Sequence, residues 1–281
     1  MKFFRILLVL VLIPLIASAQ KGPRLIVRGD DMGFSHSGNE ALIKCSKEGI
    51  QTSIEIIVPS PWFPEAVKML QENPNIDVGI HITLTSEWDN VKYRPVSNSP
   101  SLTDPDGYFY PFIFPNKNYP NLALKENNPK LEEIEKELRA QIELAKRKIP
   151  RISHISAHMG CYHMSEEVKQ LAKNLAKEYG IDIDPGDFGV KSVRYAGPKT
   201  TSEEKITSFI RMLDDLKPGE TYLFVDHPGL DTPELRAIYH IGYEDVAADR
   251  QGVTDTWTDP RVKEAIKKKG IQLISYADLK K

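Results

Sequence analysis

The stretch Arg24-Leu25-Ile26-Val27-Arg28-Gly29-Asp30-Asp31-Met32-Gly33 indicates the fold of the chain. A short apolar and β-branched run, typical of a buried strand, leads directly into a glycine and two adjacent carboxylates. An open parallel sheet usually carries a phosphate-binding fingerprint after its first strand, and the chain contains neither G-x-G-x-x-G nor a P-loop. This favours a sheet whose strand ends present acidic side chains.

Further runs of the same kind follow at residues 52–58, 77–84, 152–157, 181–183, 221–225 and 271–276. Between them, apolar residues recur every three or four positions, as in 131–145 and 168–179. Alternating strands and helices predict a parallel sheet with helices outside it. We expect a single domain over residues 20–281, an irregular (β/α) barrel of about seven parallel strands, because a barrel gathers residues from many strand ends at one rim.

Residues 1–19 have the pattern of an export signal. A basic start precedes an almost unbroken apolar run, and Ala17-Ser18-Ala19 is a small-x-small cleavage site before Gln20. The run is shorter than the roughly 20 residues that span a bilayer. An uncleaved N-terminal anchor is the alternative. We expect cleavage, and thus a periplasmic or secreted mature chain without stable membrane insertion.

The composition is that of an ordinary globular protein. The chain of 281 residues has 37 Lys+Arg against 39 Asp+Glu, 41% hydrophobic residues and two cysteines, which excludes a disordered chain and a disulfide framework. A formal net charge of -2 argues against nucleic-acid binding, since no excess of cations can replace phosphate counterions. Pairing of Cys45 with Cys161 stays open, and a homo-oligomer is compatible with the sequence.

Histidines and acidic residues fall at or near the carboxyl ends of four predicted strands. In chain order they are Asp30 and Asp31, His81, His154 and His158, and Asp226 and His227. The carboxyl ends of parallel strands share one rim of a barrel, so residues far apart in sequence meet there. We therefore expect the functional site at this rim.

Asp31, His81 and His158 are the best candidates for metal ligands. Two imidazoles and a carboxylate are the ligand set of one divalent cation, Mg²⁺ or Zn²⁺, that keeps positions open for water. His154 and His158 are four residues apart on one strand and share a face, so one can be the ligand and the other its orienting partner. Each histidine taken alone could equally be a half-buried strand residue bonded to a backbone carbonyl.

If a cation is present, the adjacent carboxylates of Asp30 and Asp31 can have different roles. Two neighbouring carboxylates repel each other unless a cation separates their tasks. If Asp31 holds the metal, Asp30 is free to act as a general base. Taken alone, the pair could also be a solvated turn or a helix N-cap.

A long segment, residues 86–125, interrupts the alternation and is rich in aromatic side chains. It holds Trp88, Tyr93, Tyr108, Phe109, Tyr110, Phe112, Phe114 and Tyr119. Long connections inside a compact domain are usually functional or disordered, and aromatic density argues against disorder. Either the aromatic side chains face a substrate or they pack on the side of the barrel.

Five ordered blocks match the patterns of one known family. They are LIVRGDDMGFS (25–35) against LIVNADDFGxS, GIHITLT (79–85) against GxHxxLT, SLTDPDGYF (101–109) against SLxDxDGxF, SHISAH (153–158) against THxDSH, and HPG (227–229). The chain thus resembles the YdjC-like carbohydrate deacetylases over nearly its whole mature length. Ser156 and Ala157 replace the Asp-Ser of the pattern, so the identity of the sugar stays open.

The resemblance implies an irregular (β/α) barrel that removes acetyl groups from N-acetylated sugars or oligosaccharides. It implies one divalent metal on Asp31, His81 and His158, with Asp30 as general base and His227 as general acid. The alternative for His227 is a loop histidine held by Asp226.

The match in the aromatic segment places Tyr108 and Phe109, and by extension Trp88, beside the acetylated carbohydrate. His154 and Asp226 would support the site from outside. Two other functions are compatible with the sequence, an exported sugar-binding protein with the same fold and little activity, and a metal phosphoesterase or aminohydrolase. A covalent mechanism is disfavoured because no G-x-S-x-G elbow is present.

Overall fold

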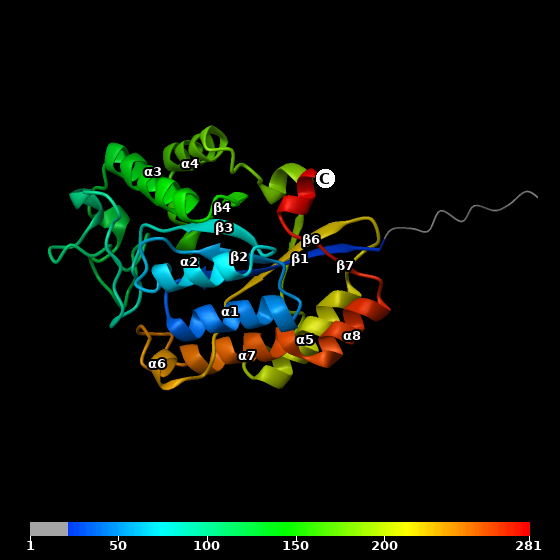
Figure 1. Cartoon of the computed structure of the whole chain (residues 1–281). Coiled ribbons are helices and arrows are strands. Elements are labelled where there is room, and N and C mark those ends of the chain that lie inside the picture. The colour runs from blue at the N-terminus through cyan, green and yellow to red at the C-terminus, as the bar shows by residue number, and fades with distance from the viewer. Residues whose placement is uncertain (1–21) are drawn as a thin grey trace, which may run out of the picture.

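Strand β1 (Arg24–Met32) lies at the centre of a seven-stranded sheet in the computed structural model, which describes residues 22–281 (Figure 1). The strand order is β4-β3-β2-β1-β6-β5, neighbouring strands pair in parallel, and β7 pairs with the beginning of β1. The other strands are β2 (Ser53–Ile56), β3 (Asp77–Ile82), β4 (His154–Ala157), β5 (Lys191–Val193), β6 (Thr221–Asp226) and β7 (Gln272–Leu273). The expected export signal, residues 1–19, lies outside the described residues.

The sheet curves into a half-barrel, which confirms the predicted parallel (β/α) barrel. Within the described residues, the edge strands β4 and β5 do not pair, so the barrel is open along the seam between them. One predicted strand is wrong: residues 181–183 form no strand, and β5 follows them instead. Asp184 accepts a hydrogen bond from the Gly186 backbone and starts a 3₁₀ turn, and Pro185 has no N–H to donate to a ladder.

Between residues 22 and 281, eight α-helices lie around the sheet. They are α1 (His36–Glu48), α2 (Phe63–Glu72), α3 (Leu131–Lys148), α4 (Glu166–Glu178), α5 (Ser202–Asp214), α6 (Pro233–Arg236), α7 (Val246–Thr258) and α8 (Pro260–Lys268). Figure 1 shows α3 and α4 over the β3 and β4 side, and α5, α7 and α8 together on the other side. None of the helices in residues 22–281 is both long and apolar enough to cross a membrane.

Helix α3 shows how the apolar spacing produces this packing. Ile134, Leu138 and Ile142 recur at four-residue intervals and are buried on one face of the helix. Glu137 lies among them, and its carboxylate accepts hydrogen bonds from the backbone N–H groups of Val96 (3.0 Å) and Ser97 (2.8 Å). The helix thereby anchors the aromatic segment 86–125 to the barrel.

Both cysteines are buried and their thiols are free in the described chain. Burial raises the pKa of Cys45 and of Cys161 to about 12. Both are therefore neutral core side chains at physiological pH, and the pairing that the sequence left open is absent within residues 22–281.

Candidate metal centre

Asp31, His81 and His158 meet at the carboxyl ends of three strands, as predicted. Asp31 is the penultimate residue of β1, His81 lies near the end of β3, and His158 directly follows β4. One ligand atom from each lies within 4.8 Å of the others, and all three side chains are buried. Three residues from distant parts of the chain thus converge at one point.

The Oδ1 atom of Asp31 is the focus of this cluster. It lies 3.5 Å from Nε2 of His81 and 3.2 Å from Nδ1 of His158, yet it has no hydrogen-bond partner within residues 22–281. A buried polar atom without a partner is costly. Ligand atoms about 2.0–2.2 Å from a shared ion lie roughly 3–4 Å apart, so these separations fit a cation between the three side chains.

Each member of the triple is held through its second polar atom. Nδ1 of His81 is 2.7 Å from Oγ of Ser156, and Nε2 of His158 is 3.0 Å from Oε2 of Glu87. Arg250 donates from Nη2 to Oδ2 of Asp31 at 2.8 Å. Partners of this kind fix the orientation of metal-binding side chains and leave one atom of each facing the centre.

The backbone also directs Asp31 toward the centre. Its φ is 72°, in the left-handed region that Asp and Asn tolerate better than most residues. Adjacent Asp30 turns its carboxylate to Arg28, which donates two hydrogen bonds at 2.7 and 2.8 Å. The two neighbouring carboxylates therefore have different environments within one cluster.

The electrostatics separate the two aspartates in the same way. Burial raises the pKa of Asp30, although the charge of Arg28 opposes that shift. Burial acts on Asp31 too, but the charges of His227 and Arg250 outweigh it and hold the pKa of Asp31 well below its usual value. Asp31 is thus the permanent anion of the pair, and Asp30 is the more basic carboxylate.

The two histidines of the triple also differ. Burial and repulsion from His158 lower the pKa of His81 well below its usual value. Burial opposes charge on His158 as well, but Glu87 and Asp31 flank its ring and raise its pKa to about 10. The space between Asp31 and His158 therefore favours positive charge.

His227 lies at the mouth of the cluster. Its side chain is 41% exposed, whereas those of the triple are at most 4% exposed. Its Nε2 is 4.0 Å from Oδ2 of Asp31, and its Nδ1 is 3.5 Å from Oδ1 of Asp226. Burial opposes the charged ring, but Asp31 and Asp226 outweigh it and raise the pKa of His227. Asp226 thus lies beside His227, as the sequence suggested.

His154, the first residue of β4, lies away from the triple in a separate buried network. Its Nε2 contacts Oε1 of Glu55, its Nδ1 is 2.7 Å from Oγ of Ser153, and its ring stacks on Tyr276 with a centroid distance of 3.6 Å. The expectation that it orients His158 is wrong, because the hydrogen bonds of His154 go to Glu55 and Ser153. Its connection to the triple runs through Glu55 and Ser156 to His81.

The aromatic side chains predicted to bind substrate are mostly inside the protein. Trp88 and Phe109 are 2% and 1% exposed, so packing accounts for both rings, and their predicted contact with a sugar has no support in their positions. Trp88 instead lies beside Arg250, whose guanidinium carbon is 5.3 Å from its ring centroid. Tyr108 is partly exposed under the guanidinium of Arg94, and its role in binding stays a prediction.

Four residues around the cluster were not predicted from the sequence. Arg28 lies two residues before Asp30, and Glu87 lies six residues after His81, so both are close in sequence to residues that were predicted. Glu55 lies within the predicted second strand, and Arg250 lies in α7 at a great sequence distance from β1. Their contribution depends on how helix and sheet pack, which the spacing does not encode.

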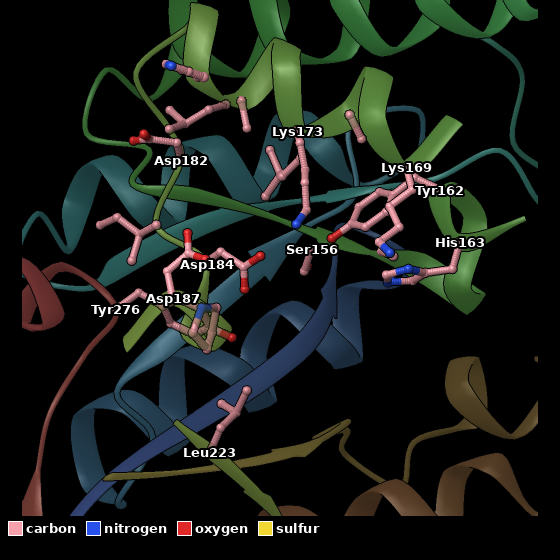
Figure 2. A pocket seen from close by; sticks show the side chains of 18 of the residues that line it. Ser156, Tyr162, His163, Lys169, Lys173, Asp182, Asp184, Asp187, Leu223 and Tyr276 are labelled. Carbon is pink, nitrogen blue, oxygen red and sulfur yellow. The ribbon is translucent and has the colours of Figure 1, made fainter. Parts of the chain in front are cut away.

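A cavity of about 490 Å³ lies at the open edge of the barrel, where residues of β4, of α4 and of the segment 181–187 before β5 line it. Figure 2 shows Lys173 of α4 reaching into it on one side, with Asp184 and Asp187 on the other. Arg28 and Ser156 also line it. Since Arg28 bonds Asp30 and Ser156 bonds His81, the cavity borders the supports of the cluster.

The fold and the cluster define a class: parallel (β/α) half-barrels with an Asp-His-His centre at the carboxyl ends of their strands. Residues 24–268 match the YdjC-like protein family model, and the chain belongs to that family. This confirms the resemblance to YdjC-like carbohydrate deacetylases.

Two relatives and one solved structure are similar to this chain. Carbohydrate deacetylase of Brevibacillus brevis is 28% identical over 269 residues, 91% of this chain and 99% of the relative. Carbohydrate deacetylase of Thermus thermophilus is 30% identical over 235 residues, 76% of this chain and 80% of the relative. A crystal structure of a proposed cellobiose-phosphate cleavage protein from Enterococcus faecalis has a TM-score of 0.73 at 24% identity, covering 92% of this chain and 99% of its own, and supports the fold.

Proposed function

We propose that this chain is a metal-dependent hydrolase that removes the acetyl group from an N-acetylated sugar or oligosaccharide. The relatives named carbohydrate deacetylase support the reaction class. The observation that carries metal dependence is the buried Oδ1 of Asp31, unpartnered within residues 22–281 and close to the ring nitrogens of His81 and His158.

Asp31, His81 and His158 would hold one divalent cation, Zn²⁺ or Mg²⁺. Such an ion, when bound, polarises the amide carbonyl and makes water a stronger nucleophile. Carboxylate and imidazole donors suit both metals. Oδ2 of the neighbouring Asp30 lies 3.6 Å from Nε2 of His81. Asp30 therefore borders the cluster, although it is not one of the three proposed ligands.

Asp30 would accept the proton of the attacking water. Arg28 holds its carboxylate by two hydrogen bonds, and burial raises its pKa toward the range in which a base is effective. The water oxygen forms a bond to the acetyl carbon as its proton goes to Asp30.

His227 would complete the reaction as the general acid. It is exposed at the mouth, its raised pKa favours the protonated ring, and Asp226 lies beside its Nδ1. The departing sugar nitrogen takes a proton from His227 as the carbon–nitrogen bond breaks, which releases acetate and an amino sugar.

The test is acetate release by the purified protein from N-acetylated mono- and oligosaccharides, with Zn²⁺ or Mg²⁺ added and after chelation. We expect acetate and free amine in equal amounts, loss of both on chelation and recovery when metal returns. Sugar binding without acetate release under every metal condition would favour a binding protein. Release of phosphate or ammonia from other substrates would favour a different hydrolase.

We also propose that the chain is exported, on the basis of its N-terminal pattern alone. An acetylated carbohydrate outside the cytoplasm would then be its substrate. N-terminal sequencing of the protein from the periplasm or medium should begin at Gln20. A chain that retains Met1 would contradict cleavage without affecting the proposed reaction.

A further inference from the structure

A continuous hydrogen-bonded chain links His81 to a carboxylate on another strand. Nδ1 of His81 lies 2.7 Å from Oγ of Ser156, and the same Oγ lies 2.5 Å from Oε2 of Glu55. All three side chains are buried, with relative exposures of 2%, 5% and 0%. The second oxygen of Glu55 contacts Nε2 of His154.

The chemistry of these groups sets the direction of the hydrogen bonds. An ionised carboxylate only accepts, and a serine hydroxyl has a single proton to donate. Ser156 therefore donates to Glu55 and accepts from His81, which places the proton of His81 on Nδ1. The Nε2 lone pair of His81 is then directed at Oδ1 of Asp31, 3.5 Å away.

The absence of a side chain at Gly79 makes room for the carboxylate of Glu55. A Cβ atom on Gly79 of β3 would lie 2.5 Å from Oε2 of Glu55 and 2.4 Å from Nε2 of His154. Any side chain at residue 79 would thus displace the pair. Tyr276 closes the other side, with its ring parallel to that of His154 within 4°.

Position 156 is also where the chain departs from its family pattern, which has Asp in THxDSH and Ser here. A serine has no charge to offer His81, and it passes the hydrogen bond on to β2. The orienting carboxylate thus comes from a neighbouring strand through one hydroxyl group.

We propose that Glu55 is a positioning residue that acts through Ser156 to hold His81 in the tautomer that leaves Nε2 free for a divalent cation. The proposal rests on the proposed function for the identity of the bound group. It concerns β2, a strand that contributes no side chain to the triple. Outer partners of this kind typically change metal affinity by roughly 10- to 100-fold.

The principal test replaces Ser156→Ala in the full mature chain and measures zinc affinity by calorimetric titration. We expect zinc to bind roughly 10- to 100-fold more weakly, the usual scale for an outer partner. Ser156→Thr keeps the hydroxyl and should restore most of the affinity. Ser153→Ala is the matched control, because Ser153 belongs to the same network but bonds His154 and Asp77 instead of His81.

The second readout is the tautomer itself, which needs neither substrate nor metal. In ¹⁵N-histidine-labelled protein, His81 should show a protonated Nδ1 and an unprotonated Nε2. Ser156→Ala should weaken or reverse that preference, and Ser153→Ala should leave it unchanged. Circular dichroism and thermal unfolding check that each variant is folded.

A swap experiment restores the carboxylate at the family position. Ser156→Asp alone places two acids together in a buried site and should lose stability, whereas Ser156→Asp with Glu55→Gln should recover both stability and zinc binding. Wild-type zinc affinity together with an unchanged His81 tautomer in Ser156→Ala would overturn the relay. A wild-type protein that binds zinc and releases no acetate would refute the proposed function and leave the relay standing.

Discussion

Two clusters of histidine and carboxylate lie in the same half-barrel, one at the rim and one on β2 and β4, and they differ in how completely they are hydrogen-bonded. At the rim, Oδ1 of Asp31 has no partner within residues 22–281 although it is buried. Deeper in the barrel, both nitrogens of His154 and both carboxylate oxygens of Glu55 have partners. The difference teaches that residue type alone does not separate a reactive cluster from a structural one.

A network whose polar atoms are all hydrogen-bonded stabilises the residues around it, whereas a cluster with an unpartnered polar atom is free to bind a ligand. Every lone pair that stays free at the rim costs stability, which the fold accepts when binding recovers it. His154 begins β4 and His158 directly follows it, yet one belongs to each cluster. Mutating each histidine in turn is the most direct way to test whether the two clusters have different roles.

The largest effect is expected for His158→Ala against His154→Ala. His158→Ala removes a proposed ligand, so metal content and activity should fall together by more than the roughly 10- to 100-fold of an outer partner, and the loss of its contact with buried Glu87 should also lower stability. His154→Ala leaves the buried Glu55 without its partner and should cost about 3–5 kcal/mol of stability. Elemental analysis and urea unfolding measure the two quantities. Loss of metal in His154→Ala with full stability would reverse the assignment.

Asp30→Asn tests whether the two neighbouring aspartates at the rim have different roles. The change keeps the shape of the side chain and removes its basicity, so kcat should fall roughly 10²- to 10⁴-fold while metal content is retained. Asp31→Asn is the matched variant on the neighbouring residue and should lose the metal. Turnover near that of the wild type in Asp30→Asn would refute the proposed mechanism. Metal loss in this variant would make Asp30 a ligand.

Glu87→Gln weakens a support of the rim without touching the buried network. Glu87 accepts from Nε2 of His158, and an amide oxygen can still accept that bond without the charge. Metal affinity should therefore fall roughly 10-fold, the lower end of the range for outer partners. Glu132→Gln, at an exposed position of α3, is the control. Equal metal affinity in both variants would show that His158 needs no charged partner.

The smallest effect is expected in the aromatic segment, for Tyr108→Ala. Tyr108 is partly exposed, and loss of its ring should raise KM a few-fold with little change in kcat if it contacts the sugar equally in ground and transition states. Phe109→Ala is the contrast, since its ring is buried and its loss should cost about 3–5 kcal/mol of stability. Unchanged kinetics of Tyr108→Ala on every substrate would leave packing as its only role.

The convergence of Asp31, His81 and His158 was predictable because topology decides it. Parallel strands align their carboxyl ends, so a residue at the end of β1 must approach one at the end of β3. The distinction between His154 and His158 was not predictable, because their spacing of four residues would place both on one face of an extended strand, whereas β4 ends at Ala157. It depends on Glu55 and Glu87, which approach from β2 and from the loop after β3.

Arg250 illustrates what spacing cannot reveal. Arg250 comes from α7 and reaches Asp31 only because that helix packs beside α1. The guanidinium carbon of Arg250 lies 4.4 Å from the ring centroid of Phe34. Residues 181–183 show the opposite limit. Their apolar alternation resembles a strand and buries Ile181 and Ile183, but Asp184-Pro185-Gly186 turns the chain into a 3₁₀ segment. Local pattern predicted burial there correctly and pairing wrongly.

The open seam has a consequence for the design of inhibitors. Arg28 and Ser156 line its cavity, and they hydrogen-bond Asp30 and His81. A compound that fills this cavity would contact the two side chains that hold Asp30 and His81, so it would disturb the orientation of both residues.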